Sequence, residues 1–251
     1  MEFNFSANTG YLWTDLPFFE RIKMAKLHGF HSVEFHDEPH SQDLVALKTL
    51  LSQLNLPVNS MNAHMGQSFG CAALPDEIPR ARKDIREAIG IAEDIGVKAL
   101  HILAGVTEDT SDAYEAFYAN LEYALEHSMI KILIEPVCEE QLPGYFLKTV
   151  TQAAQVLDVI NNPRLKIMFD CYHVQLMEGN LTQKLTRLLP HIGHIQFAGV
   201  PNRGRPDLGE VNYGHIFRHL SSLSYTAPLG AEYKVAGSTE ETLGWMNTLR
   251  T

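Results

Sequence analysis

The chain is poor in cysteine, in basic side chains and in long apolar runs, and each shortage excludes a class of protein. Its 251 residues include three cysteines, Cys71, Cys138 and Cys171, which cannot all pair within one chain and show no CxxC spacing. A disulfide framework is therefore not expected, and reduced thiols are typical of a cytoplasmic protein.

The shortage of basic charge is the strongest exclusion. Lysine and arginine number 20 against 30 aspartate and glutamate residues, which gives a formal net charge of −10, and no basic run occurs. Nucleic-acid binding normally requires a clustered surplus of positive side chains. We therefore expect no nucleic-acid partner, and an endonuclease-like activity is disfavoured for the same reason.

Long apolar runs are absent too. No stretch of about 18 apolar residues is present, and the opening "MEFNFSANTG" lacks a basic segment followed by an apolar one. The expectation is a cytoplasmic protein without a membrane partner.

What the chain does contain is a repeating pattern of short apolar runs and amphipathic stretches. Eight candidate strands are "FNFSAN" (3–8), "SVEFH" (32–36), "VNSMNAH" (58–64), "KALHILAG" (98–105), "KILIEP" (131–136), "LKIMFD" (165–170), "HIQFAG" (194–199) and "LGAEYK" (229–234). Stretches with helical spacing lie between them, at 17–29, 42–54, 78–96, 111–128 and 151–160. Strand and helix alternate along the whole chain.

Eight strand–helix units in about 250 residues predict a single (β/α)8 TIM barrel, with residues 1–251 as one domain. Gly29 and Gly96 follow helical stretches as left-handed caps, Pro79 marks a helix start, and Thr239 is a candidate N-cap. A doubly wound open sheet is the alternative. It usually carries a glycine-rich loop after its first strand, and "SANTGYLW" has none.

In such a barrel the catalytic side chains gather where the strands end. Four oxygen-bearing residues occupy those ends on four consecutive strands, namely Glu135, Asp170, Gln196 and Glu232. Three carboxylates at one point repel each other unless a cation lies among them, and hard oxygen ligands favour Mg²⁺ or Mn²⁺. An amide oxygen adds a ligand without adding charge. For each residue alone, an ordinary loop role or a hydrogen bond to the backbone remains the alternative.

Several segments resemble one family in order and spacing. They are "LIEPVCEEQLPGYFLKT", "LKIMFDCYHVQLMEGN", "GHIQFAGVPNRGRPDLGEVNYGHIFRHL" and "GAEYKVAGSTEETLGWM", together with "SANTGYLWTDLPFFERIKMAKLHGFHSVEF" and "ARKDIREAIGIAEDIGVKALHILAG". The chain resembles the hydroxypyruvate isomerase family, within the xylose-isomerase-like barrels and close to the 2-oxo-tetronate isomerases.

The resemblance implies a metal-dependent isomerase that acts on a small hydroxy-carbonyl acid. It places the metal ligands at Glu135, Asp170, Gln196 and Glu232, with Glu135 and Glu232 as the catalytic acid/base pair. It also implies substrate-binding roles for His173 and for Arg203, which matches the family position better than Arg205 does. His64 is a further candidate for the pocket.

Two loops depart from the family pattern, and other functions stay open. Gln141 stands where an acidic residue usually precedes the proline–glycine pair, and "NAHMGQSFGCAALP" replaces the usual third-strand loop. A ketose 3-epimerase on the same barrel is the first alternative, although it usually has a histidine at the place of Gln196. A non-catalytic binding protein with an inherited metal site is the second. The sequence leaves the oligomeric state open.

Overall fold

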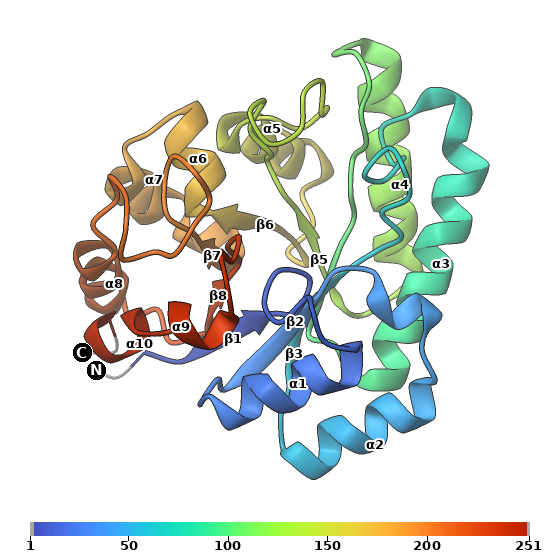
Figure 1. Ribbon diagram of the computed structural model, residues 1–251. Helices are drawn as coiled ribbons and strands as arrows, with labels where there is room; N and C mark the ends of the chain where they lie inside the picture. Colours follow the sequence, from blue (N-terminus) through green and yellow to red (C-terminus); the bar gives the residue numbers. More distant parts are fainter. Residues whose placement is uncertain (1–2, 250–251) are drawn as a thin grey trace.

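The computed structural model describes residues 3–249 and contains eight parallel strands that close into a barrel (Figure 1). The strands are β1 (Phe5–Asn8), β2 (Ser32–Phe35), β3 (Val58–Asn62), β4 (Ala99–His101), β5 (Lys131–Ile134), β6 (Leu165–Asp170), β7 (Ile192–Phe197) and β8 (Leu229–Ala231). Each strand pairs with the next in the sequence, and β1 pairs with β8 through Phe5 and Leu229. The predicted barrel and all eight predicted strands are confirmed.

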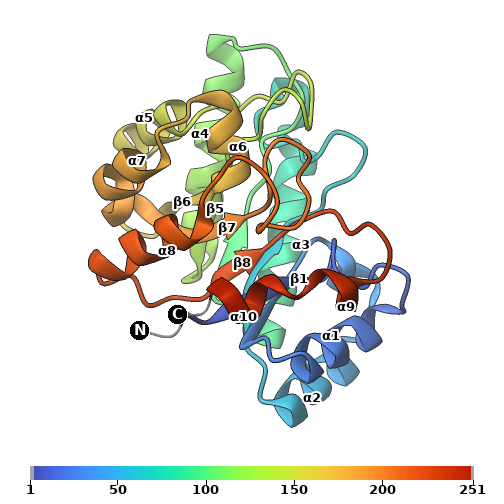
Figure 2. The ribbon, with the colours of Figure 1, turned by 60° about the vertical axis from the view of Figure 1, so that its left-hand side comes forward.

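Helices surround this barrel as an outer ring (Figures 1 and 2). They are α1 (Phe18–Leu27), α2 (Leu44–Leu54), α3 (Ile78–Ile95), α4 (Ser111–His127), α5 (Val150–Ile160), α6 (Cys171–Met177), α7 (Leu181–Leu188), α8 (Tyr213–Ser222), α9 (Thr239–Thr242) and α10 (Trp245–Leu249). Short 3₁₀ helices are η1 (Glu38–Ser41), η2 (Pro75–Glu77) and η3 (Leu189–His191). All five helices expected from the apolar spacing are present.

The helix ends agree with most of the predicted signals. Gly96 caps α3 in a left-handed conformation with φ of 76°, and Gly29 follows α1 with φ of 80°. The prediction for Thr239 is wrong, because the N-cap of α9 is Ser238, whose hydroxyl accepts from the amide of Glu241. The Thr239 hydroxyl instead accepts a hydrogen bond from the backbone of Trp13.

Removing the side-chain cap of α2 should lower stability. Asp43 Oδ1 accepts hydrogen bonds from the amides of Val45 and Ala46, both at 3.0 Å. Asp43→Ala should therefore lower the free energy of unfolding by about 1 kcal/mol, measured by urea denaturation. Asp43→Ser keeps a capping oxygen and serves as the control; equal losses in both variants would contradict the capping role.

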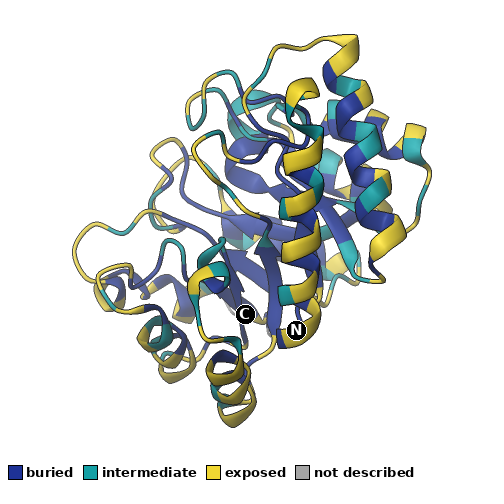
Figure 3. Ribbon diagram, turned by 90° about the vertical axis from the view of Figure 1, so that its right-hand side faces the viewer, coloured by how far each residue is buried: buried dark blue, intermediate teal, exposed yellow. Residues whose placement is uncertain are grey.

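Burial is highest in the strands, while the outer faces of the helices are exposed (Figure 3). Aromatic rings pack between the strands and the last helix. Trp245 of α10 packs edge-on against Phe5 of β1 and Phe197 of β7, with ring centroids 4.9 and 5.3 Å away. No helix in residues 3–249 is long and apolar enough to cross a membrane. The predicted single domain includes residues 1, 2, 250 and 251, which lie outside the described part, so its full extent stays a prediction.

Candidate active site at the carboxyl ends of the strands

The four oxygen-bearing residues predicted from the sequence all lie at one end of the barrel. Glu135 directly follows β5, Asp170 ends β6, Gln196 lies near the end of β7, and Glu232 directly follows β8. Asp170 is the register partner of Gln196, which in turn pairs with Gly230 on β8. All four side chains are buried. Parallel strands therefore place them at similar depth, as the sequence predicts.

Glu135, Asp170 and His173 form one buried cluster. Their nearest ligand atoms lie within 4.8 Å of one another. His173 Nε2 is 3.4 Å from Asp170 Oδ2 and 3.8 Å from Glu135 Oε1. The first turn of α6 places His173 there, because the Asp170 carboxylate caps that helix through the amide of Tyr172.

Arg203 lies between the carboxylates of Asp170 and Glu232. Its Nη2 donates to Glu232 Oε2 at 2.7 Å and to Asp170 Oδ2 at 3.2 Å. The guanidinium carbon lies over the rings of Tyr11 and Tyr172, 4.9 and 5.3 Å from their centroids. Arg203 is 4% exposed, so its charge is neutralised by the two carboxylates rather than by water. Glu232 thus joins the cluster through an arginine.

Glu232 is surrounded by donors. Besides Arg203, Asn8 Nδ2 lies 3.0 Å and His36 Nε2 lies 3.1 Å from Glu232 Oε1. Burial alone would raise the pKa of Glu232, but the charge of Arg203 and the contacts with His36 outweigh it and lower this pKa. Burial alone would lower the pKa of His36, whereas the hydrogen bond and charge of Glu232 raise it. The Glu232 carboxylate is therefore held ionised.

Glu135 and Asp170 have the opposite electrostatics. Burial, reinforced by the charges of Glu232 and Asp170, raises the pKa of Glu135 well above its usual range. Burial raises the pKa of Asp170 to about 7, although Arg203 acts in the opposite direction. The cluster thus contains more acidic groups than the single arginine neutralises.

The contact made by Nδ1 of His173 determines which of its two ring nitrogens carries the proton. Nδ1 accepts a hydrogen bond from the amide of Cys138 at 3.2 Å, so it carries no proton. Burial, and then the charge of Arg203, lower the pKa of His173 well below its usual value. The neutral ring therefore holds its proton on Nε2, which faces Glu135 and Asp170. His173 is oriented as a hydrogen-bond donor into the site.

Glu135, His173, Arg203 and Glu232 border a small cavity of about 90 Å³. Its polar lining comprises Tyr11, His36, Asn62, His101, Glu135, Gln141, His173, Arg203 and Glu232. Its apolar lining comprises Met65, Phe69, Leu103, Val137, Leu142 and Tyr145. The cavity therefore has a charged floor at the strand ends and an apolar wall from the third, fourth and fifth strand-to-helix connections.

Three further residues of this site lie at strand ends in the first half of the barrel, and the sequence pattern marks two of them, His36 and His101. Asn8 ends β1, His36 directly follows β2, and His101 ends β4. Burial lowers the pKa of His101 to about 3, so its ring is neutral; its Nδ1 contacts Asn62 Oδ1 at 2.9 Å. As strand-end histidines, His36 and His101 are candidates for the pocket from sequence, although a core or loop role is the preferred interpretation for each, and both line the cavity. Asn8 also ends a strand but was not among the predicted residues.

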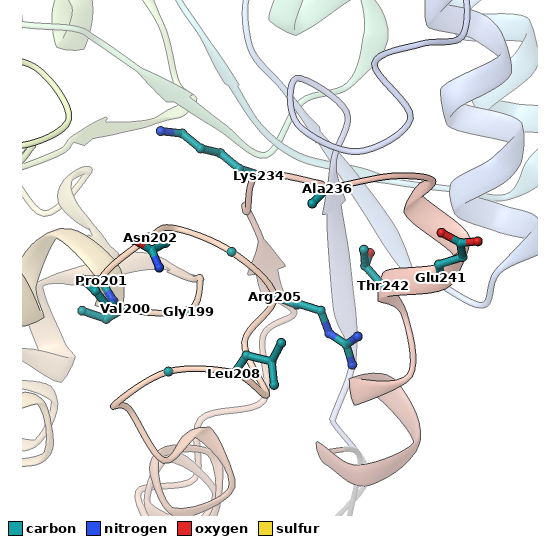
Figure 4. Close-up of a pocket in the computed structure, with 12 residues that line it drawn as sticks. Gly199, Val200, Pro201, Asn202, Arg205, Leu208, Lys234, Ala236, Glu241 and Thr242 are labelled. Carbon is teal, nitrogen blue, oxygen red and sulfur yellow. The ribbon is translucent and has the colours of Figure 1, made fainter.

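Four sequence candidates are not among the lining residues: Asp170 and Gln196, which are buried at the strand ends, and His64 and Arg205. His64 is exposed, and its Nδ1 lies 3.3 Å from Asp37 Oδ2. Arg205 lines a separate pocket of about 530 Å³ between the β7–α8 connection and α9 (Figure 4). There it is paired with Asp207 through both Nε and Nη2. Of the two arginines in "NRGRP", Arg203 alone reaches the carboxylates.

The residues present fit a divalent cation. Glu135 Oε1 and Gln196 Oε1 are buried and have no hydrogen-bond partner among residues 3–249. Buried polar atoms are normally paired, so two orphaned oxygens beside surplus carboxylates indicate a missing positive partner. The donor set is composed of oxygen atoms, which Mg²⁺ and Mn²⁺ prefer.

Comparison with known proteins gives consistent matches over almost the whole chain. The family model described as Xylose isomerase-like TIM barrel matches residues 22–249. A 2-oxo-tetronate isomerase of Pectobacterium atrosepticum is 37% identical, over 96% of this chain and 95% of its own. The hydroxypyruvate isomerase of Escherichia coli is 34% identical, over 98% of this chain and 99% of its own. This chain belongs to the xylose isomerase-like TIM barrel family.

Within that family it groups with the hydroxypyruvate and 2-oxo-tetronate isomerases, so the predicted resemblance is confirmed. A crystal structure described as AP endonuclease, family 2, from Brucella melitensis has a TM-score of 0.94 at 32% identity and covers 100% of both chains. A D-allulose 3-epimerase from Methylomonas sp. has a TM-score of 0.77 at 18% identity, over 99% of this chain and 90% of that one. The second likeness shows the fold alone.

The two loops that depart from the isomerase pattern both reach the cavity. Gln141 lines it from the β5–α5 connection, and Met65 and Phe69 line it from the β3–α3 connection. The two loops that differ from the isomerase pattern therefore form part of the cavity wall, which a bound ligand would contact.

Proposed function

We propose that the protein is a metal-dependent isomerase of small hydroxy-carbonyl acids, of the hydroxypyruvate/tartronate semialdehyde or 2-oxo-tetronate type. The observation that carries the proposal is the placement of Glu135 and Glu232 at one small cavity, together with the unpaired oxygens of Glu135 and Gln196. The activities of the curated relatives support the same substrate class.

The reaction needs two proton-transfer groups. Moving a carbonyl group by one carbon requires removal of a proton beside it and return of a proton to the neighbouring carbon, through an enediolate. Glu135 and Glu232 reach the cavity from β5 and β8, which are separated by β6 and β7. Substrate between them meets a carboxyl group on either side. In the reverse reaction the two glutamates exchange roles.

The remaining residues bind and orient the substrate. His173 presents Nε2–H towards the site and can donate to a substrate oxygen. Arg203 adds a buried guanidinium, whose charge and planar donors suit a carboxylate or an enediolate oxygen. The apolar wall that includes Leu103, Leu142 and Tyr145 keeps water from the reacting carbons. His64 stays a candidate on the loop that carries Met65.

Glu135, Asp170, Gln196 and Glu232 would hold the cation, as the family resemblance implies. When bound, Mg²⁺ or Mn²⁺ would supply positive charge that stabilises negative charge developing on the substrate oxygens. The chain itself contributes the ligands, the donor histidine and the two proton carriers. We do not propose an endonuclease activity, because the net charge of −10 disfavours a nucleic-acid partner.

A screen by proton exchange tests class and substrate together. Small 2-oxo acids, hydroxy acids, tetronates and ketoses are incubated with the protein and Mn²⁺ or Mg²⁺ in deuterated water. We expect deuterium to enter beside the carbonyl of one of the acids, detected by nuclear magnetic resonance, because each turnover removes and returns a proton there. Exchange on ketoses alone would favour the epimerase alternative.

Metal removal tests the cofactor. Dialysis against a chelator should lower turnover of the identified substrate by roughly a hundredfold or more, since charge stabilisation by a metal contributes several kcal/mol. Addition of Mn²⁺ should restore it. Unchanged turnover after elemental analysis has verified metal loss would refute the metal role.

A further inference from the structure

A second group of polar side chains lies inside the barrel around Gln196. Barrel interiors are usually filled by branched apolar residues. Here Glu34 of β2, Ser60 of β3 and His194 of β7 are all buried, and Glu34 is 1% exposed. β2 and β7 are not neighbours in the barrel, so Glu34 reaches its β7 partners across the interior.

Glu34 uses both carboxylate oxygens in this group. Oε2 contacts His194 Nε2 closely and accepts from Ser60 Oγ at 3.4 Å. Oε1 accepts from Gln196 Nε2, also at 3.4 Å. His194 and Gln196 lie two residues apart on β7 and therefore point to the same face of the strand. Glu34 is thus tied to the strand that carries the neutral oxygen of the site.

The chemistry of these groups fixes which end of the amide faces Glu34. A carboxylate only accepts hydrogen bonds, and a glutamine amide has donors on nitrogen alone. Turning the amide over would place two oxygens against each other in a buried space. The nitrogen of Gln196 must therefore face Glu34, which directs its oxygen elsewhere, and that oxygen is the one without a partner among the described residues.

Gly230 provides the space for this arrangement. A Cβ atom at this position would lie 2.4 Å from Glu34 Oε1 and 2.9 Å from Gln196 Cγ. Both distances are too short for real atoms, so the absence of a side chain on β8 allows the Glu34 carboxylate to approach the amide. Three strands, β2, β7 and β8, thus combine to set one amide orientation.

We propose that Glu34 is a positioning residue that holds the Gln196 amide with its oxygen free to coordinate a divalent cation. This rests on the metal role in the proposed function. Glu34 acts only through Gln196: removing its acceptor oxygen leaves the amide free to turn and to present its nitrogen, which cannot bind a cation. The expected consequence is weaker metal binding.

A double-mutant cycle on Mn²⁺ affinity tests this coupling. The affinity of the full-length, metal-depleted protein is measured by titration of Mn²⁺ alone, with free Mn²⁺ followed by electron paramagnetic resonance. Glu34→Met, which fills similar space without an oxygen, should weaken binding by about 10- to 100-fold. In a protein that already carries Gln196→Ala, the same change should weaken binding less than about threefold, because the amide it positions is gone.

The cycle separates coupling from other effects. Loss of the Glu34 negative charge would weaken cation binding equally in both backgrounds, so equal losses would overturn the proposal. Glu34→Gln keeps an oxygen in the same place and should weaken binding less than Glu34→Met. If Glu34→Met does not fold, the cycle is run with Glu34→Leu, which also lacks an acceptor oxygen, and the same criterion applies. Absence of Mn²⁺ binding to the wild-type protein would instead refute the metal role itself.

Discussion

Glutamine in place of Glu135 or Glu232 is expected to lower the isomerisation rate by at least about a hundredfold, because each glutamate is proposed to carry one of the two protons. Glutamine has the same size but cannot accept or return a proton at the substrate carbon. The measurement is turnover and deuterium exchange of the identified acid with saturating Mn²⁺. The free energy of unfolding of each variant is measured alongside, to exclude loss of the fold as the cause.

Glu140→Gln is the matched control for this experiment. Glu140 is exposed in the same β5–α5 connection and does not line the cavity, so its replacement should leave turnover unchanged. Turnover by Glu135→Gln or Glu232→Gln close to that of the wild type would sink the assigned mechanism. A loss in Glu140→Gln of similar size would show that charge in this loop matters generally.

The fold and the placement of the four oxygen ligands could be predicted because both depend on local pattern. Alternating apolar strands and amphipathic helices determine the barrel, and a parallel barrel brings strand ends to one face whatever the loops do. Glu135, Asp170, Gln196 and Glu232 are therefore placed by counting along strands. The N-cap of α9 was misplaced by one residue, because Ser238 and Thr239 are adjacent and both are good caps.

The contacts that complete the site could not be read in this way. Arg203 reaches Asp170 and Glu232 from a loop. Its backbone there is left-handed, with φ of 54°, and no residue pattern in the sequence predicts this conformation. Glu34 and Gln196 are 162 positions apart in the sequence, and their hydrogen bond crosses the barrel from β2 to β7. It therefore depends on side-chain directions in the closed structure. Sequence spacing predicts depth along a strand, but it does not predict which neighbour a side chain contacts.

Replacing Arg203 by methionine is expected to destabilise the metal-free protein by about 3–5 kcal/mol. The change leaves Asp170 and Glu232 buried without their shared cation, and such uncompensated charges are costly. Removing the guanidinium also raises the pKa of Glu232, which Arg203 holds down. Where a group has a higher pKa in the folded protein than in the unfolded chain, the folded protein becomes less stable as pH rises. The destabilisation caused by Arg203→Met should therefore grow from about pH 5 to about pH 8. Urea unfolding at the two pH values measures it.

Addition of Mn²⁺ gives the same variant a second, opposite expectation. A divalent cation among Glu135, Asp170 and Glu232 would replace the positive charge that the variant lacks, so Mn²⁺ should stabilise Arg203→Met more than the wild type. Arg205→Met is the control: Arg205 is paired with Asp207 at a partly exposed position, where an ion pair contributes about 1 kcal/mol or less. A loss in Arg203→Met no larger than that of the control would show that the buried carboxylates do not depend on Arg203. If Mn²⁺ stabilised the wild type and Arg203→Met equally, the cation would lie away from the carboxylates that Arg203 bridges.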